Sequence, residues 1–69
     1  MKIKVNGKEK LIAIENKKAL LSSTLKLLGY SPNTIVVEVN DLIINSKKWE
    51  DEILKDGDRL EIVSIVGGG

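Results

Sequence analysis

The stretch "KIKVNGKEKLIAI", residues 2–14, decides the fold because it predicts a β-hairpin near the start of the chain. Ile3 and Val5 alternate with polar or charged residues, as expected for a strand with one buried face. The dipeptide Asn6-Gly7 then gives the strongest short hairpin signal, because both residues tolerate positive φ. A second strand is expected to follow, from about Glu9 to Ile14.

After this hairpin, the period of the apolar residues changes from that of a strand to that of a helix. Leu21, Leu25 and Leu28 fall at positions i, i+4 and i+7, so they share one helix face. Asn16 is a suitable N-cap residue, and Gly29 suits the left-handed position that often follows a helix. The sequence therefore predicts one main helix between these two residues, with its leucine face packed on a sheet.

Three further strands are expected in the second half of the chain, at residues 34–40, at residues 42–44 and after a turn at residues 56–58. The last strand places Leu60 and Ile62 on one face. A single helix segregated from the strands indicates an α+β fold, with a mixed four- to five-stranded sheet and the helix on one face. The long connection through the helix allows the first and last strands to pair in parallel as the central pair.

The segment "NSKKWEDEIL", residues 45–54, predicts a single helical turn or a loop. Ser46 is its candidate N-cap, and Trp49 is expected to fill the core beneath it rather than to contact a ligand. The three adjacent acidic residues 50–52 cannot all face one metal ion from a helix. We interpret them as solvated charge.

The composition describes one small domain with few groups suited to catalysis. The chain has 69 residues, no cysteine, no histidine, one Trp, one Tyr and a net charge of +1. The lack of Cys and His excludes the usual nucleophilic triads and zinc sites. The near balance of positive and negative residues argues against binding of nucleic acid, because nucleic-acid binders usually carry a clear basic excess. No apolar stretch approaches the roughly 20 residues that span a bilayer. We therefore expect a cytoplasmic protein that is not an enzyme and is a monomer when free.

Four pieces of the sequence, in this order and at these spacings, resemble a known family. They are "VEVN" at residues 37–40, Trp49, "LKDGDRLEIV" at residues 54–63 and "VGGG" at residues 66–69. With the hairpin, helix and strand order, they resemble the β-grasp fold of ubiquitin-like proteins, and most closely the ThiS family of sulfur carrier proteins in thiamin thiazole biosynthesis. Where many family members have a Pro-Arg pair before the tryptophan, this chain has Asn45-Ser46.

The resemblance implies a β-grasp domain at residues 1–66, a flexible glycine tail at residues 67–69, and a protein substrate rather than an enzyme. In the family, a ThiF/MoeB-like adenylating enzyme uses ATP and Mg²⁺ to convert the C-terminal carboxylate into an acyl-adenylate. Sulfur from a persulfide donor displaces AMP and leaves a thiocarboxylate, and a thiazole synthase takes that sulfur into the thiazole ring. Carried over, Gly69 is the modified residue, while Gly67 and Gly68 enter partner active sites. The carrier binds no cofactor or metal of its own.

Val63 and Ile65 are candidates for the surface that docks on such a partner. They lie beside the tail, on the face of the last strand opposite Leu60 and Ile62. If exposed, they form an apolar patch of the kind that marks a partner site. The same residues also fit a second buried face that is covered by a loop.

Other functions fit the same sequence. One alternative is the sulfur carrier that forms the small subunit of molybdopterin synthase, which resembles this family in fold and in its Gly-Gly end. Others are a ubiquitin-like modifier that is conjugated to lysines, and a β-grasp binding module whose tail has no chemistry. Three terminal glycines taken alone also fit a flexible chain end.

Overall fold

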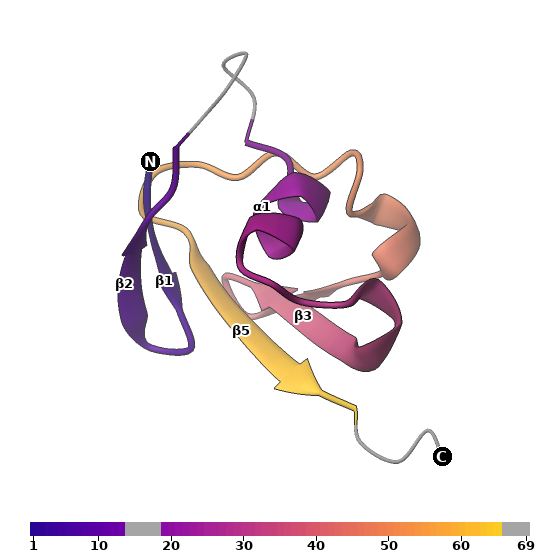
Figure 1. Cartoon of the computed structure of the whole chain (residues 1–69). Helices are drawn as coiled ribbons and strands as arrows, with labels where there is room; N and C mark the ends of the chain where they lie inside the picture. The colour runs from indigo at the N-terminus through magenta and orange to yellow at the C-terminus, as the bar shows by residue number, and fades with distance from the viewer. Residues whose placement is uncertain (14–18, 66–69) are drawn as a thin grey trace.

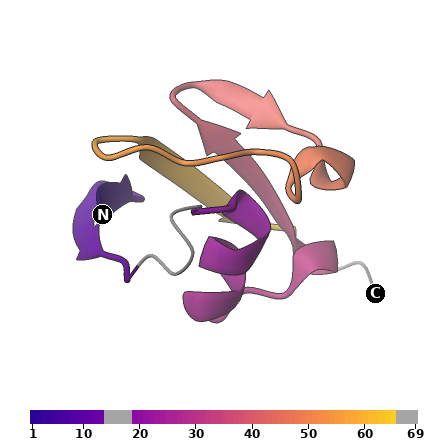
Figure 2. The same cartoon turned by 90° about the horizontal axis from the view of Figure 1, so that it is seen from above.

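A computed structural model describes residues 1–13 and 19–65, which form a five-stranded sheet and one α-helix (Figure 1). In chain order the elements are β1 (Lys2–Val5), β2 (Lys8–Leu11), α1 (Leu21–Leu27), the 3₁₀ helix η1 (Pro32–Thr34), β3 (Ile35–Val39), β4 (Leu42–Ile44), the 3₁₀ helix η2 (Ser46–Lys48) and β5 (Arg59–Ser64). The helix lies on one face of the sheet (Figure 2). The predicted α+β class is confirmed, and the sheet has the larger of the two expected strand counts.

The strand order in the sheet is β2-β1-β5-β3-β4, so the last strand of the chain lies at its centre. β1 and β5 are parallel, with Val5 opposite Leu60, whereas the other neighbouring strands are antiparallel. The predicted parallel pairing of the first and last strands is therefore confirmed. β5 thus pairs with β1 on one side and with β3 on the other, and it joins the two halves of the sheet.

The predicted hairpin joins β1 to β2. Asn6 and Gly7 have φ values of 51° and 81°, as a tight turn between antiparallel strands requires. Ile3 and Val5 are buried, while the alternating Lys2 and Lys4 are exposed. The second strand is shorter than predicted, because β2 ends at Leu11 and Ile14 lies outside the described residues.

The start of α1 differs from the prediction. The N-cap residue is Leu20, not Asn16, which lies outside the described residues. No side chain caps this end; instead the N–H of Leu21 donates to the main-chain oxygen of Glu52 at 2.8 Å, and the next N–H donates to that of Trp49 at 3.1 Å. Two of the free N–H groups of the first turn are thus satisfied by a segment that is distant in sequence.

The end of α1 agrees with the prediction. Gly29 has φ 89°, and its N–H donates to the oxygen of Lys26 at 3.0 Å. The N–H of Tyr30 donates to the oxygen of Leu25, also at 3.0 Å. These two bonds form a Schellman motif, which explains why glycine suits this position and why the helix stops here.

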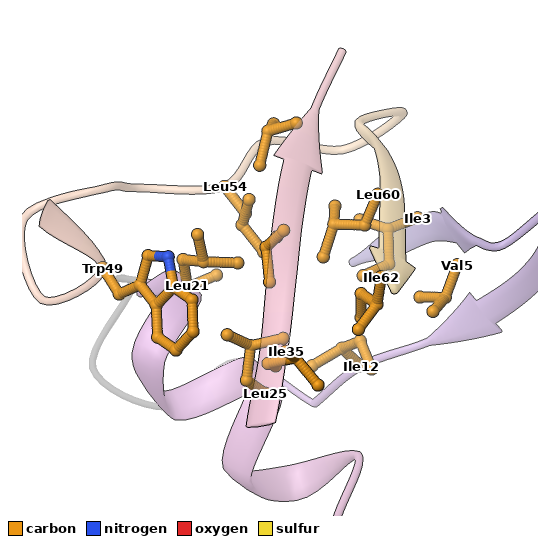
Figure 3. Close-up of a cluster of buried hydrophobic side chains, with 13 residues drawn as sticks. Ile3, Val5, Ile12, Leu21, Leu25, Ile35, Trp49, Leu54, Leu60 and Ile62 are labelled. Carbon is orange, nitrogen blue, oxygen red and sulfur yellow. The ribbon is translucent and has the colours of Figure 1, made fainter. Parts of the chain in front are cut away.

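One apolar core lies between α1 and the sheet (Figure 3). Its buried members are Ile3, Val5, Ile12, Ala19, Leu21, Leu25, Ile35, Val37, Val39, Trp49, Leu54, Leu60 and Ile62. Leu28, the third residue of the predicted helix face, is partly buried against this cluster. The core therefore uses the predicted faces of the helix and of the strands at both ends of the chain.

Trp49 packs in this core beside Leu21, as Figure 3 shows, and the prediction that it fills the core is confirmed. Its indole N–H donates to the main-chain oxygen of Ile44 at 2.9 Å, so the polar atom of the ring is satisfied. The turn before it is η2, whose N-cap is Asn45 rather than the predicted Ser46. The Asn45 side chain accepts a hydrogen bond from the N–H of Lys47 at 2.9 Å, a contact that a cap one residue later does not provide.

Candidate partner-docking site

The two faces of β5 differ sharply in their exposure to solvent. Leu60 and Ile62 are buried in the core, with exposed fractions of 1% and 7%. Val63 and Ile65, on the opposite face, are 58% and 53% exposed. The predicted alternation of buried and exposed residues is confirmed. The exposure of Val63 and Ile65 also shows that no described segment covers these two side chains.

The exposed side chains of β5 continue onto the neighbouring strand. Val63 lies directly opposite Val36 of β3, so their side chains stand on the same sheet face. The N–H of Ile65 donates to the oxygen of Thr34 at 2.6 Å, which extends this pairing just past the end of β5. We call Val36, Val63 and Ile65 the apolar strip. It lies on the side of the sheet away from the helix.

Two glutamates face each other on the same side of the sheet, two residues along from the apolar strip. Glu38 of β3 lies directly opposite Glu61 of β5. Within the part of the chain that the structure describes, neither carboxylate forms a salt bridge. Like charges at directly opposed positions destabilise a sheet. This pair therefore lowers stability and places acidic charge next to the apolar strip.

Glu61→Gln is expected to raise the free energy of unfolding by about 0.2–1 kcal/mol, because the amide removes one of the two opposed charges. The gain should shrink at high salt, since screening weakens repulsion between exposed charges. Urea unfolding at low and high salt measures both effects. Glu50→Gln, at an exposed glutamate outside the sheet, is the control. An equal gain in the control would assign the effect to net charge rather than to the pair.

Two asparagine side chains hold β5 from its two neighbouring strands. From the β1–β2 turn, the Oδ1 atom of Asn6 accepts from the N–H of Ile62 at 2.7 Å, and its Nδ2 atom donates to the Ile62 oxygen at 3.2 Å. From the β3–β4 turn, the Oδ1 atom of Asn40 accepts from the N–H of Arg59 at 3.0 Å. The sequence predicts Asn6 as a turn residue but gives no sign of this second contact, which depends on how distant strands pair.

The predicted modified residue, Gly69, lies outside the described residues, as do Gly67 and Gly68. The described chain brings them to a defined starting point, because Ile65 is fixed to β3 at the carboxyl end of the central strand. The apolar strip adjoins that point. The apolar strip and the last described residue of the chain therefore lie together at the carboxyl end of β5.

Residues 3–69 match the sequence profile of the ThiS family. The chain belongs to the ThiS family. Members of this family are small sulfur carriers rather than catalysts. The crystal structure of the thiamine biosynthesis protein ThiS from Geobacter metallireducens superposes with a TM-score of 0.82 at 26% identity, and the match covers 100% of both chains. That agreement confirms the predicted β-grasp fold.

Two kinds of protein are similar in sequence to this ThiS chain. "Uncharacterized protein ycf40" of Trieres chinensis is 39% identical over 49 residues, which are 71% of this chain and 67% of that protein. The "Thiazole synthase" of Paramagnetospirillum magneticum is 36% identical over 69 residues, which are 100% of this chain and 20% of that protein. The ThiS chain thus spans only one fifth of the length of that thiazole synthase.

Three other features of this ThiS domain bear on the choice of a candidate site. In residues 1–13 and 19–65 there is no group of three or more carboxylate, His or Cys side chains that could hold a metal ion. A cavity of about 360 Å³ between α1 and the segment after η2 is lined by serines, Lys26, Tyr30, Trp49 and Glu50, among others. None of the helices in these ranges is long and apolar enough to cross a membrane. The open sheet face and the end of β5 remain the main candidate site.

Proposed function

We propose that this chain carries sulfur for the formation of the thiazole ring of thiamin, with the carboxylate of Gly69 as the reactive group. The observation that carries the proposal is the position of β5 in a chain of the ThiS family. β5 is the central strand of the sheet, and the sequence continues from it through Ile65 and Val66 into Gly67 and Gly68. The domain provides a rigid base from which a short glycine segment can reach into another protein.

The proposed chemistry needs a partner because a carboxylate is a poor electrophile. A ThiF/MoeB-like enzyme with ATP and Mg²⁺ would join the Gly69 carboxylate to AMP and release pyrophosphate, which supplies a good leaving group. The terminal sulfur of a persulfide then attacks the carbonyl, AMP leaves, and an acyl disulfide forms. A thiol reduces that disulfide to the Gly69 thiocarboxylate and is itself oxidised to a disulfide with the donor sulfur. This carrier supplies none of these catalytic groups.

The glycines suit this delivery for a steric reason. Without a Cβ atom, glycine passes through a narrow channel and adopts backbone angles that other residues avoid. Ordering three residues costs roughly 3–6 kcal/mol, so the affinity must come from another surface. We assign that surface to the apolar strip, of which Val63 and Ile65 are the predicted members. The fitting partner surface is apolar, with a basic side chain that faces Glu38 and Glu61.

A thiazole synthase is the proposed acceptor of the sulfur. The thiazole synthase of Paramagnetospirillum magneticum contains a segment that resembles this whole chain, and that of Magnetococcus marinus does so at 31% identity. A segment of this kind within one polypeptide with a named thiazole synthase supports a functional association between the two. The adenylating enzyme and the persulfide donor are proposed from the chemistry of the ThiS family.

Intact mass spectrometry of the protein from cells with an active thiamin pathway tests the proposal. We expect a species in which one oxygen is replaced by sulfur, and fragmentation should place that sulfur at Gly69. The rates at which purified adenylating enzymes of the thiamin and molybdenum-cofactor types adenylate the chain with ATP would show which of the two kinds of sulfur carrier it is. If only unmodified chain and lysine-linked adducts appear, the protein is a modifier and the proposal is wrong.

A further inference from the structure

The side chain of Asn6 takes the place of a peptide group in the sheet. The main-chain N–H of Asn6 donates to the oxygen of Leu60 at 2.8 Å, which is the last main-chain bond from β1 to β5. At Asn6 the chain turns into the hairpin with φ 51°, so its main chain leaves the β5 edge. The side-chain carboxamide then makes the next two bonds, accepting from the N–H of Ile62 at 2.7 Å and donating to its oxygen at 3.2 Å.

A carboxamide is suited to this position because it has the acceptor and donor pair of a peptide group. Ile62 therefore has both main-chain groups bonded on the β1 side, although β1 itself ends at Val5. Aspartate would present oxygen to the Ile62 carbonyl and lose the donated bond. Glycine would keep the positive φ of the turn and lose both contacts.

Ile62 is the last residue of β5 that is bonded on this side among the described residues. Beyond it, β5 diverges from the β1–β2 hairpin, as Figures 1 and 2 both show. Val63 and Ser64 are paired only with β3, and Ile65 adds a single bond to Thr34. The Asn6 contact therefore lies at the point where the central strand changes from two neighbours to one.

We propose that Asn6 is a positioning residue for sulfur transfer, because it fixes the direction in which β5 leads into the C-terminal glycines. The consequence for transfer rests on the proposed function. The Asn6 carboxamide holds Ile62 against the end of β1, so Val63–Ile65 start from a fixed point and the apolar strip keeps its relation to the tail. Without this contact, the end of β5 is held by β3 alone and its direction varies more. A smaller fraction of molecules then has the apolar strip and the tail in the arrangement that the adenylating enzyme binds.

Asn6→Gly and Asn40→Gly form a matched pair of variants. Both asparagines have positive φ in a two-residue hairpin turn, and both bond the main chain of β5 through their side chains. Asn40 bonds Arg59, at the end of β5 far from the tail, whereas Asn6 bonds Ile62. Glycine preserves each turn, and each variant loses two side-chain hydrogen bonds. Asn6→Gly loses both bonds to the Ile62 main chain, whereas Asn40→Gly loses one bond to the Arg59 N–H and one to the Asp58 carboxylate at 3.0 Å. The two variants therefore differ mainly in which end of β5 loses its contacts.

Hydrogen exchange and backbone ¹⁵N relaxation measure the structural effect. In Asn6→Gly we expect the Ile62 amide to exchange about tenfold faster than in the wild type, because it loses a hydrogen-bond acceptor. The order parameters of Ser64 and Ile65 should fall. In Asn40→Gly, the Ile62 amide and these order parameters should keep their wild-type values. Asn6→Asp retains the acceptor for Ile62 and should lie between the wild type and Asn6→Gly.

ATP–pyrophosphate exchange with the adenylating enzyme measures the functional effect. We expect Asn6→Gly to raise the KM for the carrier roughly tenfold with little change in kcat, because the apparent affinity falls with the fraction of competent molecules. Asn40→Gly should leave this KM unchanged. Equal KM values for the two variants, or an unchanged Ile62 amide in Asn6→Gly, would overturn the inference. If the wild-type chain is not adenylated at all, the proposed function fails, whereas the exchange and relaxation data still decide what Asn6 does to β5.

Discussion

Removal of Gly69 is expected to reduce adenylation by at least about 10²-fold while leaving the stability of the domain almost unchanged. The shortened chain still ends in a glycine carboxylate, that of Gly68, so the chemical group is retained. Its reach is shorter by one residue, which is at most about 3.3–3.6 Å of extended chain. A misplacement of about 1 Å at a reacting centre can already lower the rate about 10²-fold. Distance rather than reactivity would therefore limit the shortened chain.

A carrier with a C-terminal carboxamide at Gly69 is the matched control. It keeps the length of the tail and removes the nucleophilic carboxylate, so it should bind the adenylating enzyme yet release no pyrophosphate. ATP–pyrophosphate exchange measures activation in both proteins, and urea unfolding measures their stability. A large loss of stability on removal of Gly69 would show that the tail is structural and would contradict the proposed function.

The alternation along β3 and β5 could be predicted from the sequence because it depends on local spacing alone. A period of two with apolar residues on one face places Val37, Leu60 and Ile62 in the core, and the structure agrees. The end of α1 was predictable for the same reason. Gly29 and the two carbonyl groups that it helps to satisfy lie within one turn of the helix.

The start of α1 could not be predicted, because two of its first N–H groups are satisfied from another part of the chain. Asn16 has the right side chain for a cap, but the main-chain oxygens of Trp49 and Glu52 already occupy that role for α1. A pattern search that covers only neighbouring residues cannot weigh such a competitor. Tertiary contacts often override local propensity in this way.

In the candidate site too, local patterns could be predicted from the sequence, whereas contacts between distant residues could not. The sequence predicts that Val63 and Ile65 share a face, but their exposure depends on whether another segment covers that face. The contact of Asn6 with Ile62 joins residues 56 positions apart and exists only in the observed register of β1 and β5. The opposition of Glu38 and Glu61 likewise follows from the register of β3 and β5. Register is a property of the folded sheet, so these contacts lie beyond local sequence patterns.

Leu60→Ala is expected to have the largest effect on stability, a loss of about 2–5 kcal/mol from the free energy of unfolding. Leu60 is 1% exposed on the central strand, and its removal leaves a cavity between the sheet and the helix. A domain of 69 residues has a total stability of only about 3–10 kcal/mol. The variant should therefore be partly or wholly unfolded at 37 °C, as circular dichroism during heating would show.

Val63→Ala, three residues along the same strand, should have the opposite profile. Its side chain is 58% exposed and lies opposite Val36 in the sheet, so the expected loss of stability is at most about 0.5 kcal/mol. If the apolar strip docks on the adenylating enzyme, truncation there should weaken binding by more than about 1 kcal/mol, or about fivefold in Kd. Titration calorimetry with that enzyme measures the change. We expect the buried face of β5 to stabilise the domain and its exposed face to bind the enzyme. If Val63→Ala and Ile65→Ala both bind with wild-type affinity, the apolar strip is not the docking surface.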